Sequence, residues 1–462
     1  MQYISTRGQA PKIGFCDVLL AGLARDGGLY VPETWPRLSQ PAAGVATNYA
    51  QKAASIMSPF VGAEIDQQVF EKLCTEAYST FRHPEVAPLV EIGPNEYLLE
   101  LFHGPTLAFK DIALQLVGKL FDHVLTQRNE RVMIVGATSG DTGGAAFDGV
   151  ASCRNVDIVM LYPNNRVSDV QRRQMTTLTA PNVHAVAVDG TFDDCQDLVK
   201  AMFNDQKFRD ANQLSAVNSI NWVRVMAQIV YYATAIEKLG RSAVFSVPTG
   251  NFGNVLAGWI AKQMGAQIEG FVVASNTNDI LTRFFESKQM AANEVVPTLS
   301  PSMDIQVSSN FERLLFETNN RDGAETAKQL TSFRATGKLE VSASVYQEWF
   351  EGVFVGRRCN DEQTLATMQD VFKHSGMLID PHTAVGLSAA RQSAGVDYPK
   401  KMPMITLATA HPAKFPDAVF RATGQVPKLP EHLADLMSRP ERSISLPNDL
   451  KAVQAFVASC CK

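Results

Sequence analysis

The chain lacks the patterns that define several common classes of protein. Its seven cysteines are odd in number and, apart from an adjacent pair near the C-terminal end, lie far apart with no CxxC spacing. We therefore expect neither a disulfide framework nor a structural metal, and a reducing compartment fits this cysteine usage. Basic residues are scattered along a chain of net charge −5. Such a distribution carries no electrostatic footprint for nucleic acid.

Long hydrophobic runs are also missing. No apolar stretch approaches the roughly 20 residues that a membrane span requires, and the opening MQYISTRGQAPKIGF has no continuous apolar core. We therefore expect an unprocessed, cytoplasmic protein with no membrane partner. The P-loop and GxGxxG patterns are absent too, which argues against a nucleotide-binding oxidoreductase.

The composition is that of a multidomain globular protein. The 462 residues are too many for one compact core, and 45% hydrophobic with 19% charged residues is near the globular average. Residues 1–95 form a distinct opening region, with amphipathic helices expected at 49–60 and 67–81. A second region follows over 96–430, and residues 431–462 are expected to pack as a C-terminal tail.

From residue 96 onward, the sequence repeats a pattern of strand, glycine-rich turn and helix. The strands are short and apolar without alternation, at residues 132–135, 158–161, 183–188, 244–247, 271–274 and 405–408. This pattern predicts an α/β fold whose parallel sheet is covered on both faces. Ligands bind such sheets at the carboxyl ends of the strands, where both glycine-rich turns lie.

One lysine stands out in the segment LFHGPTLAFKD at residues 101–111. Lys110 follows Leu107, Ala108 and Phe109, and a lysine held among such residues is poorly solvated as an ammonium. Its pKa should fall, which frees the amine to act as a nucleophile that forms an imine. The alternative is that Lys110 simply opens a surface helix over 112–121.

Two glycine-rich turns offer anion sites. In PTGNFGN, residues 248–254, the glycines at 250 and 253 allow backbone N–H groups to converge on a phosphate at the start of the helix 255–264. In TSGDTGG, residues 138–144, hydroxyl groups and backbone donors suit a carboxylate or phosphate, ahead of a helix expected over 145–151. The alternatives are a tight turn that needs glycine only for its backbone angles, and an ordinary helix cap.

Two further polar segments complete the set. In NSINWVR, the side chains of Asn218, Ser219, Asn221 and Arg224 could line one side of a pocket, although Arg224 could equally lie on a helix surface. ATAHPAKF, residues 408–415, presents Thr409 at the end of a strand. His411 and Lys414 in this segment could be structural. An imine-forming lysine, a phosphate cup and a hydroxyl-rich turn at strand ends are together what pyridoxal phosphate chemistry requires.

These segments resemble a known family. HGPTLAFKD, SGDTG, NSIN, PTGNFG and ATAHPAKF, in this order, are similar to the threonine synthases, which belong to the tryptophan-synthase-β-like, fold-type II group of pyridoxal phosphate enzymes. The likeness runs from YISTRG and DGGLYVP near the N-terminus to the C-terminal region. It implies a cofactor held between two α/β subdomains within residues 96–430, with 1–95 as an additional N-terminal domain.

The resemblance assigns roles to individual residues. Lys110 would be catalytic and hold the cofactor as a Schiff base. Cofactor binding would involve Lys110, Gly250, Asn251, Phe252, Gly253, Asn254 and Thr409. Substrate binding would involve Thr138, Ser139, Asp141, Thr142, Asn218, Ser219 and Arg224. Many relatives carry Asp where this chain has Asn254, and we expect the amide to cap the helix that follows.

The activity that the resemblance implies is a carbon–oxygen lyase reaction on a phosphate ester. O-phosphohomoserine and water would yield threonine and phosphate, as the last step of threonine biosynthesis, by a monomer or a homodimer. A serine or threonine dehydratase of the same cofactor group would share the lysine and the phosphate cup but not a second phosphate site. A binding protein on a decayed enzyme scaffold is the other alternative.

Overall fold

The computed structural model describes residues 1–38 and 48–461. Its N-terminal region begins with strands β1 (Tyr3–Ser5) and β2 (Tyr30–Pro32), which pair antiparallel, and contains helix α1 (Phe15–Ala21) between them. Helices α2 (Tyr49–Val61) and α3 (Gln67–Tyr78) follow and confirm the two amphipathic helices expected there. Asn48 and Asp66 cap them by accepting hydrogen bonds from the first backbone N–H groups.

One parallel sheet has the order β15-β7-β6-β5-β8 among the described residues. Its strands are β5 (Val132–Ala137), β6 (Val156–Pro163), β7 (Val183–Asp189), β8 (Leu214–Ser215) and β15 (Ile444–Pro447). The helices around it are α4 (Lys110–Arg128), α5 (Asp141–Val150), α6 (Asp169–Thr176), α7 (Phe192–Asn204), α8 (Gln206–Ala211) and α18 (Leu450–Cys460). The C-terminal segment thus adds an edge strand, and α18 packs its apolar residues Val453 and Val457 against the sheet.

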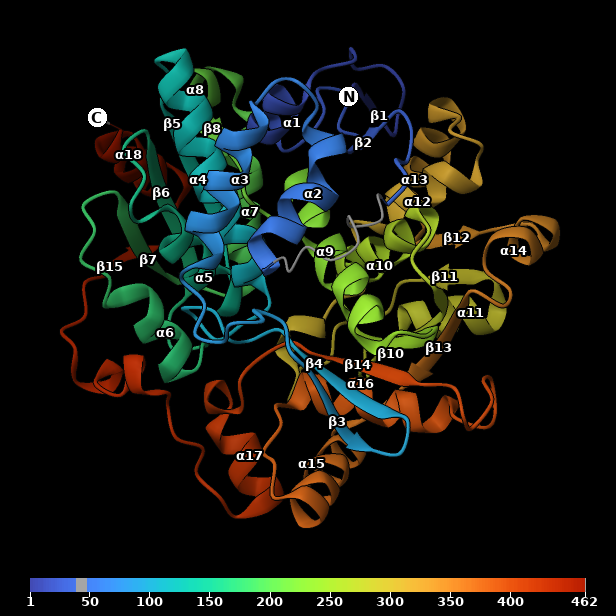
Figure 1. Ribbon diagram of the computed structural model, residues 1–462. Helices are drawn as coiled ribbons and strands as arrows, with labels where there is room; N and C mark the ends of the chain where they lie inside the picture. The colour runs from blue at the N-terminus through green and yellow to red at the C-terminus, as the bar shows by residue number, and fades with distance from the viewer. Residues whose placement is uncertain (39–47, 462) are drawn as a thin grey trace.

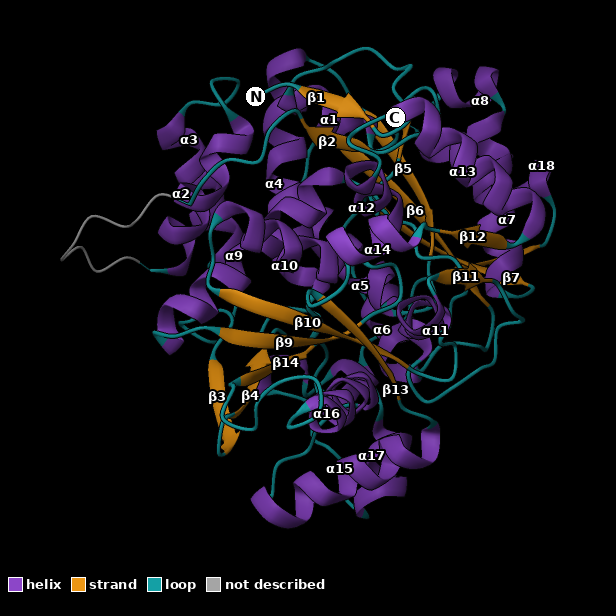
Figure 2. Cartoon of the chain, turned by 90° about the vertical axis from the view of Figure 1, so that its right-hand side faces the viewer, coloured by secondary structure: helices purple, strands orange, loops and turns teal. Residues whose placement is uncertain are grey.

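The second sheet has the order β13-β10-β9-β14-β4-β3, and all its pairings are parallel except β3 with β4. Its strands are β3 (Leu89–Gly93), β4 (Glu96–Glu100), β9 (Ala243–Pro248), β10 (Ile268–Ser275), β13 (Phe354–Arg358) and β14 (Met404–Ala408). Figure 2 shows α9 (Trp222–Leu239) and α10 (Gly253–Met264) on one face, and α15 (Asp361–Ser375), α16 (Pro381–Ser393) and α17 (Pro416–Thr423) on the other.

Residues 276–350 form an irregular extension of the second sheet. They contain α11 (Ile280–Ser287), η1 (Pro301–Met303), α12 (Phe311–Thr318), α13 (Gly323–Thr336), α14 (Ala343–Trp349) and the antiparallel pair β11 (Gln289–Ala291) and β12 (Lys338–Glu340). Short turns η2 (Pro412–Lys414), η3 (Glu431–Leu433) and η4 (Leu436–Ser438) lie near the C-terminus. In Figure 1, α12 and α13 lie beside β2 of the N-terminal region.

The fold confirms the α/β prediction, because two largely parallel sheets are covered by helices. Every expected strand is present. The helix expected over 145–151 was placed too late, since α5 already begins at Asp141. The physical reason is that Thr138 Oγ1 accepts the backbone N–H groups of Gly140 and Gly143, which folds the glycine-rich turn into the first helical turn.

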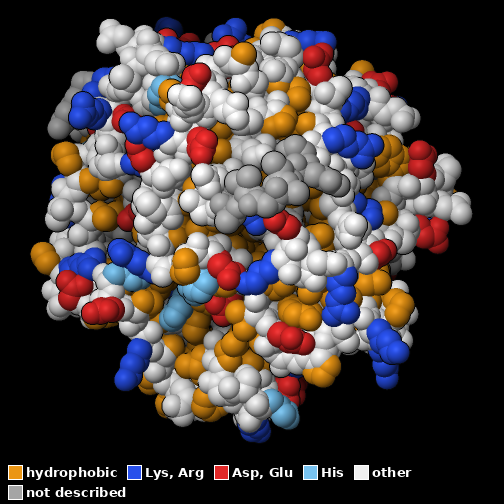
Figure 3. Space-filling model, viewed as in Figure 1, with side chains coloured by type: hydrophobic (Ala, Val, Ile, Leu, Met, Phe, Trp, Pro, Cys, Tyr) orange, Lys and Arg blue, Asp and Glu red, His pale blue; other side chains and the backbone are white. Residues whose placement is uncertain are grey.

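Surface charge is mixed on the face drawn in Figure 3, where acidic and basic side chains are interspersed. Within residues 1–38 and 48–461, no helix is long and apolar enough to cross a membrane.

Candidate active site

Lys110 begins α4, and its position is fixed by the strand that ends beside it. The N–H of Phe109 donates to the carbonyl oxygen of Thr409 at 2.9 Å, and Ala108 forms a β-bridge with Ala410. The end of β14 therefore holds the backbone immediately before the lysine. Lys110 itself is 9% exposed, so the prediction of a poorly solvated lysine is confirmed.

Asp141 lies between two buried lysines. Lys110 Nζ is 3.3 Å from Asp141 Oδ2, and Lys414 Nζ is 2.8 Å from the other oxygen, Oδ1. Gln171 Nε2 also donates to Oδ1, at 2.9 Å. Burial by itself would raise the pKa of Asp141, but the two ammonium groups outweigh it and hold that pKa well below its ordinary value.

The pKa of Lys110 is lowered. Burial is the main cause, and the nearby charges of Lys414 and Arg224 act in the same direction, while Asp141 partly opposes them. A lysine with a lowered pKa offers more of its neutral, nucleophilic form near neutral pH. The structure thus supplies the electrostatic condition for imine formation.

The GNFG loop joins β9 to α10 and exposes a row of backbone donors. Phe252 adopts a left-handed conformation with φ of 62°, which turns the chain into the helix. The N–H groups of Gly250, Asn251 and Phe252 donate no hydrogen bond to any described residue. Their carbonyl groups are held instead, because Ser308 Oγ donates to Gly250 O at 2.6 Å and Asn310 N donates to Asn251 O at 3.0 Å. Free N–H groups at a helix start fit a phosphate group.

Asn254 does not cap this helix, so that expectation was wrong. Phe252 occupies the N-cap position, and Asn254 lies inside the first turn with its side chain directed to α9. Its Oδ1 accepts hydrogen bonds from the hydroxyl groups of Tyr231 and Tyr232. The left-handed Phe252 starts the helix before residue 254, which places the amide among buried tyrosines.

The NSIN turn precedes α9 and carries a buried arginine. Asn221 caps α9 by accepting from Val223 N at 3.0 Å, whereas Asn218 is exposed and Ser219 half-buried. Arg224 is 4% exposed, so the surface-helix alternative is wrong. Its Nη1 donates to Val217 O at 3.0 Å, while its Nε has no partner within the described part of the chain. Burial lowers the pKa of Arg224 to about 10.

The SGDT turn faces the same region from the other sheet. Thr138 is buried, and its hydroxyl oxygen is occupied by the two N–H groups that close the turn. Ser139 and Thr142 are half-buried on either side of Asp141. Their hydroxyl groups, rather than the lysine-bound Asp141 carboxylate, are the donors that this turn offers to an anion.

Sequence reasoning missed several residues around Asp141. Lys414 appeared only as a structural alternative, and Gln171 and Ser302 were not considered. Ser302 Oγ lies 3.4 Å from Asp141 Oδ2, and its backbone N–H donates to His382 Nε2 at 3.3 Å. Lys414 could have been found from its place in ATAHPAKF, but no local pattern marked Gln171 or Ser302.

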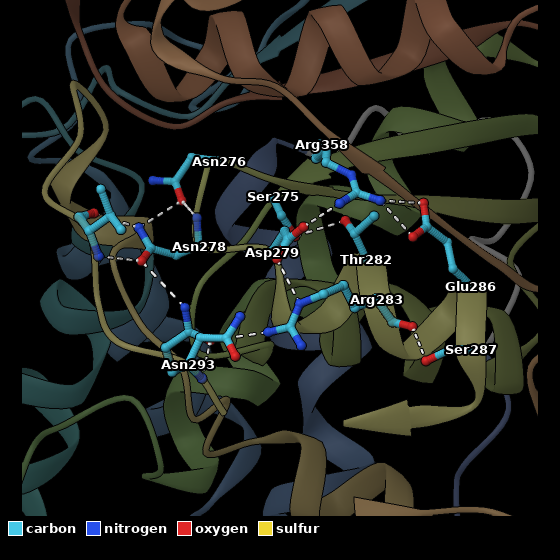
Figure 4. A network of polar contacts seen from close by, with 12 residues as sticks. Ser275, Asn276, Asn278, Asp279, Thr282, Arg283, Glu286, Ser287, Asn293 and Arg358 are labelled. Carbon is cyan, nitrogen blue, oxygen red and sulfur yellow. Dashed lines mark hydrogen bonds and ion pairs between the residues drawn. The ribbon is translucent and has the colours of Figure 1, made fainter. Parts of the chain in front are cut away.

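Asn276 and Asn278, which follow β10, take part in a network of polar contacts (Figure 4). Asn278 exchanges two hydrogen bonds with the backbone of Val296, each at 2.8 Å. Asn276 Oδ1 accepts from Asn278 N at 2.8 Å, and Asn276 Nδ2 donates to Asp304 Oδ1 at 2.7 Å. These contacts fix an otherwise irregular loop over the end of β10.

The fold and site together define a pyridoxal-phosphate-dependent enzyme of fold-type II, whose cofactor is pyridoxal 5′-phosphate. The buried lysine and the unpartnered N–H groups of the GNFG loop fit that cofactor. The chain belongs to the threonine synthase family. Family models described as "Threonine synthase N terminus", "Pyridoxal-phosphate dependent enzyme" and "Threonine synthase, C-terminal" match residues 2–78, 84–348 and 383–457, respectively.

Individual relatives agree with this assignment. The threonine synthase of Pseudomonas aeruginosa is 54% identical, with 99% of this chain and 98% of that protein covered. The threonine synthase of Saccharomyces cerevisiae is 41% identical over 91% of this chain and 88% of its own length. A crystal structure of pyridoxal-phosphate-bound threonine synthase from Brucella melitensis has a TM-score of 0.96 and 50% identity, with both chains fully covered.

Proposed function

We propose that the chain converts O-phospho-L-homoserine and water into L-threonine and phosphate, as the last step of threonine biosynthesis. The observation that supports the substrate assignment is a buried arginine, Arg224, which lies outside the GNFG loop and would bind a second anion. Arg224 is buried beside the NSIN turn and has no ion pair with a described carboxylate. Burial of an unpaired guanidinium group costs free energy unless an anion binds to it. The substrate phosphate would do so.

The cofactor would be held by residues of both sheets. Lys110 would bind it covalently through Nζ, and the N–H groups of Gly250, Asn251, Phe252 and Gly253 would hold its phosphate. Thr409 would face the ring nitrogen with a hydroxyl group, which leaves that nitrogen largely unprotonated. Asn254 would serve the cofactor indirectly, by fixing the start of α10 against α9.

When bound, pyridoxal phosphate supplies an electron sink next to the substrate's α carbon. Lys110 Nζ, as the nearest base, would remove a proton from the α carbon and then one from the β carbon. Arg224, with Asn218 and Ser219 of the NSIN turn, would hold the phosphate and balance its charge as it leaves the γ carbon. Of the two protons that Lys110 removes, one would go to the γ carbon, which becomes the methyl group of threonine, and the other would return to the α carbon. The hydroxyl group of water would add at the β carbon, and the remaining proton of that water would go to the released phosphate.

The substrate carboxylate would lie at the SGDT turn. Ser139 and Thr142 would donate to it, and Thr138 would keep the turn in shape. Asp141 would act as the counter-ion of Lys110 and Lys414. Because its negative charge is balanced by these lysines, it would not repel the substrate carboxylate.

A direct assay tests the proposal. Purified enzyme should release phosphate from O-phosphohomoserine and form threonine, and its absorbance spectrum should show the bound cofactor. L-Serine serves as the matched substrate, because it offers the same amino acid group without a phosphate. Turnover of serine with none of O-phosphohomoserine would favour a dehydratase, and a colourless protein that binds no added cofactor would favour a non-catalytic role.

We propose a cytoplasmic protein, in keeping with seven cysteines that are all free. We further propose the division into an N-terminal domain at 1–95, a catalytic region at 96–430 and a tail at 431–462.

A further inference from the structure

The first turn of α12 is clamped to the N-terminal region. Thr6 Oγ1 donates to Glu312 Oε1 at 2.6 Å, and Arg7 reaches both oxygens of Glu312 at 3.2 Å. Figures 1 and 2 both show β2 beside α12. The next residue, Arg313, donates from Nε to the carbonyl oxygen of Tyr30 at 2.9 Å. Two consecutive residues of α12 thus bind two separate segments of the N-terminal region.

The same guanidinium group also reaches the active site. Arg313 Nη2 donates to the carbonyl oxygen of Ile220 in the NSIN turn at 2.7 Å, and Nη1 donates to Asn310 Oδ1. Because the fork of an arginine is planar and rigid, these bonds fix the relative positions of three chain segments. Arg313 is 1% exposed, so water does not compete for its donors.

Asn310 extends this connection to the GNFG loop. Its Nδ2 donates to Ser219 O at 2.9 Å, and its backbone N–H donates to Asn251 O at 3.0 Å. A Cβ atom placed on Gly253 would lie 3.2 Å from Asn310 Nδ2, which shows how closely the loop and the amide approach. The GNFG loop and the NSIN turn therefore meet on Asn310, and Asn310 is held by Arg313.

The acceptors of Arg313 are all neutral. They are two carbonyl groups and one amide, and no described carboxylate forms an ion pair with this arginine. Burial lowers the pKa of Arg313 to about 9. Its charge adds to the positive potential around the NSIN turn, where Arg224 already lies.

We propose that Arg313 is a positioning residue that sets the spacing between the cofactor-phosphate loop and the substrate-phosphate turn. The clamp of Thr6 and Arg7 on Glu312 holds α12 in the position that this requires. The inference rests on the proposed function of the two loops. It gives the N-terminal region a role in the active site, because that region holds α12 through Glu312 and Arg313.

The test compares Arg313→Lys with Arg321→Lys. A lysine keeps the charge at 313 but cannot make the three directed bonds. Arg321 also binds the N-terminal region, through Nη1 and the carbonyl oxygen of Pro32 at 3.0 Å, and pairs with Glu317. Within the described residues it forms no hydrogen bond with the GNFG loop or the NSIN turn. Arg321→Lys therefore tests the effect of weakening a contact with the N-terminal region without changing either loop.

Arg313→Lys should raise KM for O-phosphohomoserine at least about tenfold and speed the release of pyridoxal phosphate from diluted holoenzyme, with a smaller change in kcat. Arg321→Lys should leave all three values near those of the wild type. Equal changes in both variants, or unchanged KM and cofactor release in Arg313→Lys, would overturn the proposal.

Thr6→Val provides a second variant if Arg313→Lys does not fold. It removes one bond to Glu312 with little change in shape, and should raise KM in the same direction but less. An unchanged KM in Thr6→Val would refute the clamp. Cofactor release is measured without substrate. It therefore still tests the positioning role of Arg313 if the wild type does not act on O-phosphohomoserine.

Discussion

Lys414 Nζ and Lys110 Nζ bind opposite oxygens of one carboxylate, that of Asp141, at 2.8 and 3.3 Å. Lys414 is fully buried and also donates to the carbonyl oxygen of Thr106 at 2.9 Å. Asp141 thus has a second lysine partner besides Lys110. Lys110 can lose its charge without leaving the buried carboxylate unpaired, which would be costly.

Replacement of Lys110 by alanine should abolish turnover, because the site then has no amine to bind the cofactor or to move a proton. The absorbance of covalently bound cofactor should disappear, while circular dichroism stays unchanged. Lys119→Ala, a half-buried lysine on the same helix, is the control. Retention of turnover, or a borohydride-fixed label on another lysine, would refute the assignment.

Replacement of Lys414 by methionine should change the pH dependence of cofactor capture. Lys414 lowers the pKa of Lys110, so its removal raises that pKa. Capture needs the neutral amine, and the acid limb of its rate should therefore move to higher pH. The measurement is the rate of absorbance change after pyridoxal phosphate is added to apoenzyme. The exposed Lys428→Met should leave the profile unmoved, and a shift to lower pH in Lys414→Met would contradict the prediction.

Replacement of Arg224 by glutamine should weaken the substrate far more than the cofactor. Loss of a charged hydrogen bond of about 1.5–3 kcal/mol corresponds to a KM increase of roughly 10- to 150-fold. Steady-state kinetics and cofactor titration separate the two effects. Arg241→Gln, an exposed arginine just beyond α9, is the control. An equal loss of cofactor affinity would count against a role in substrate binding.

Replacement of Gly250 by alanine should weaken cofactor binding by about tenfold or more. The added Cβ would lie 2.8 Å from the carbonyl oxygen of Ser302, so the loop must shift. A tenfold loss corresponds to about 1.4 kcal/mol. Gly93→Ala, where the nearest atom is 3.5 Å away, should be tolerated. Cofactor affinity measured by fluorescence titration would remain unchanged in Gly250→Ala if the loop did not hold the cofactor.

Asn254 should tolerate aspartate better than alanine. Aspartate keeps an acceptor for the Tyr231 and Tyr232 hydroxyl groups and places a negative charge in the first turn of α10. The amide nitrogen that it replaces has no partner in the described chain. Alanine removes the acceptor and should lower the free energy of unfolding by about 1–3 kcal/mol. Denaturant unfolding of both variants checks this order, and equal stabilities would contradict it.

The sequence by itself determined the elements that depend on local pattern. Apolar strands without alternation predicted parallel sheets, and the apolar neighbours of Lys110 predicted its burial, because both signals lie within a few residues. The glycine-rich turns fell at strand ends for the same reason. The first residue of α5 could not be predicted from the sequence pattern, because two hydrogen bonds to the Thr138 side chain fold the turn into the helix.

Only the tertiary structure decided how distant segments share their charges and hydrogen bonds. Lys414 meets Asp141, Asn254 meets two tyrosines of α9, and Thr6 meets Glu312, a residue 306 positions away. No periodicity in a sequence encodes such pairings, because they arise when two sheets and the N-terminal region pack together. Local physics therefore established which groups the site contains, and long-range packing established which of them hold one another in place.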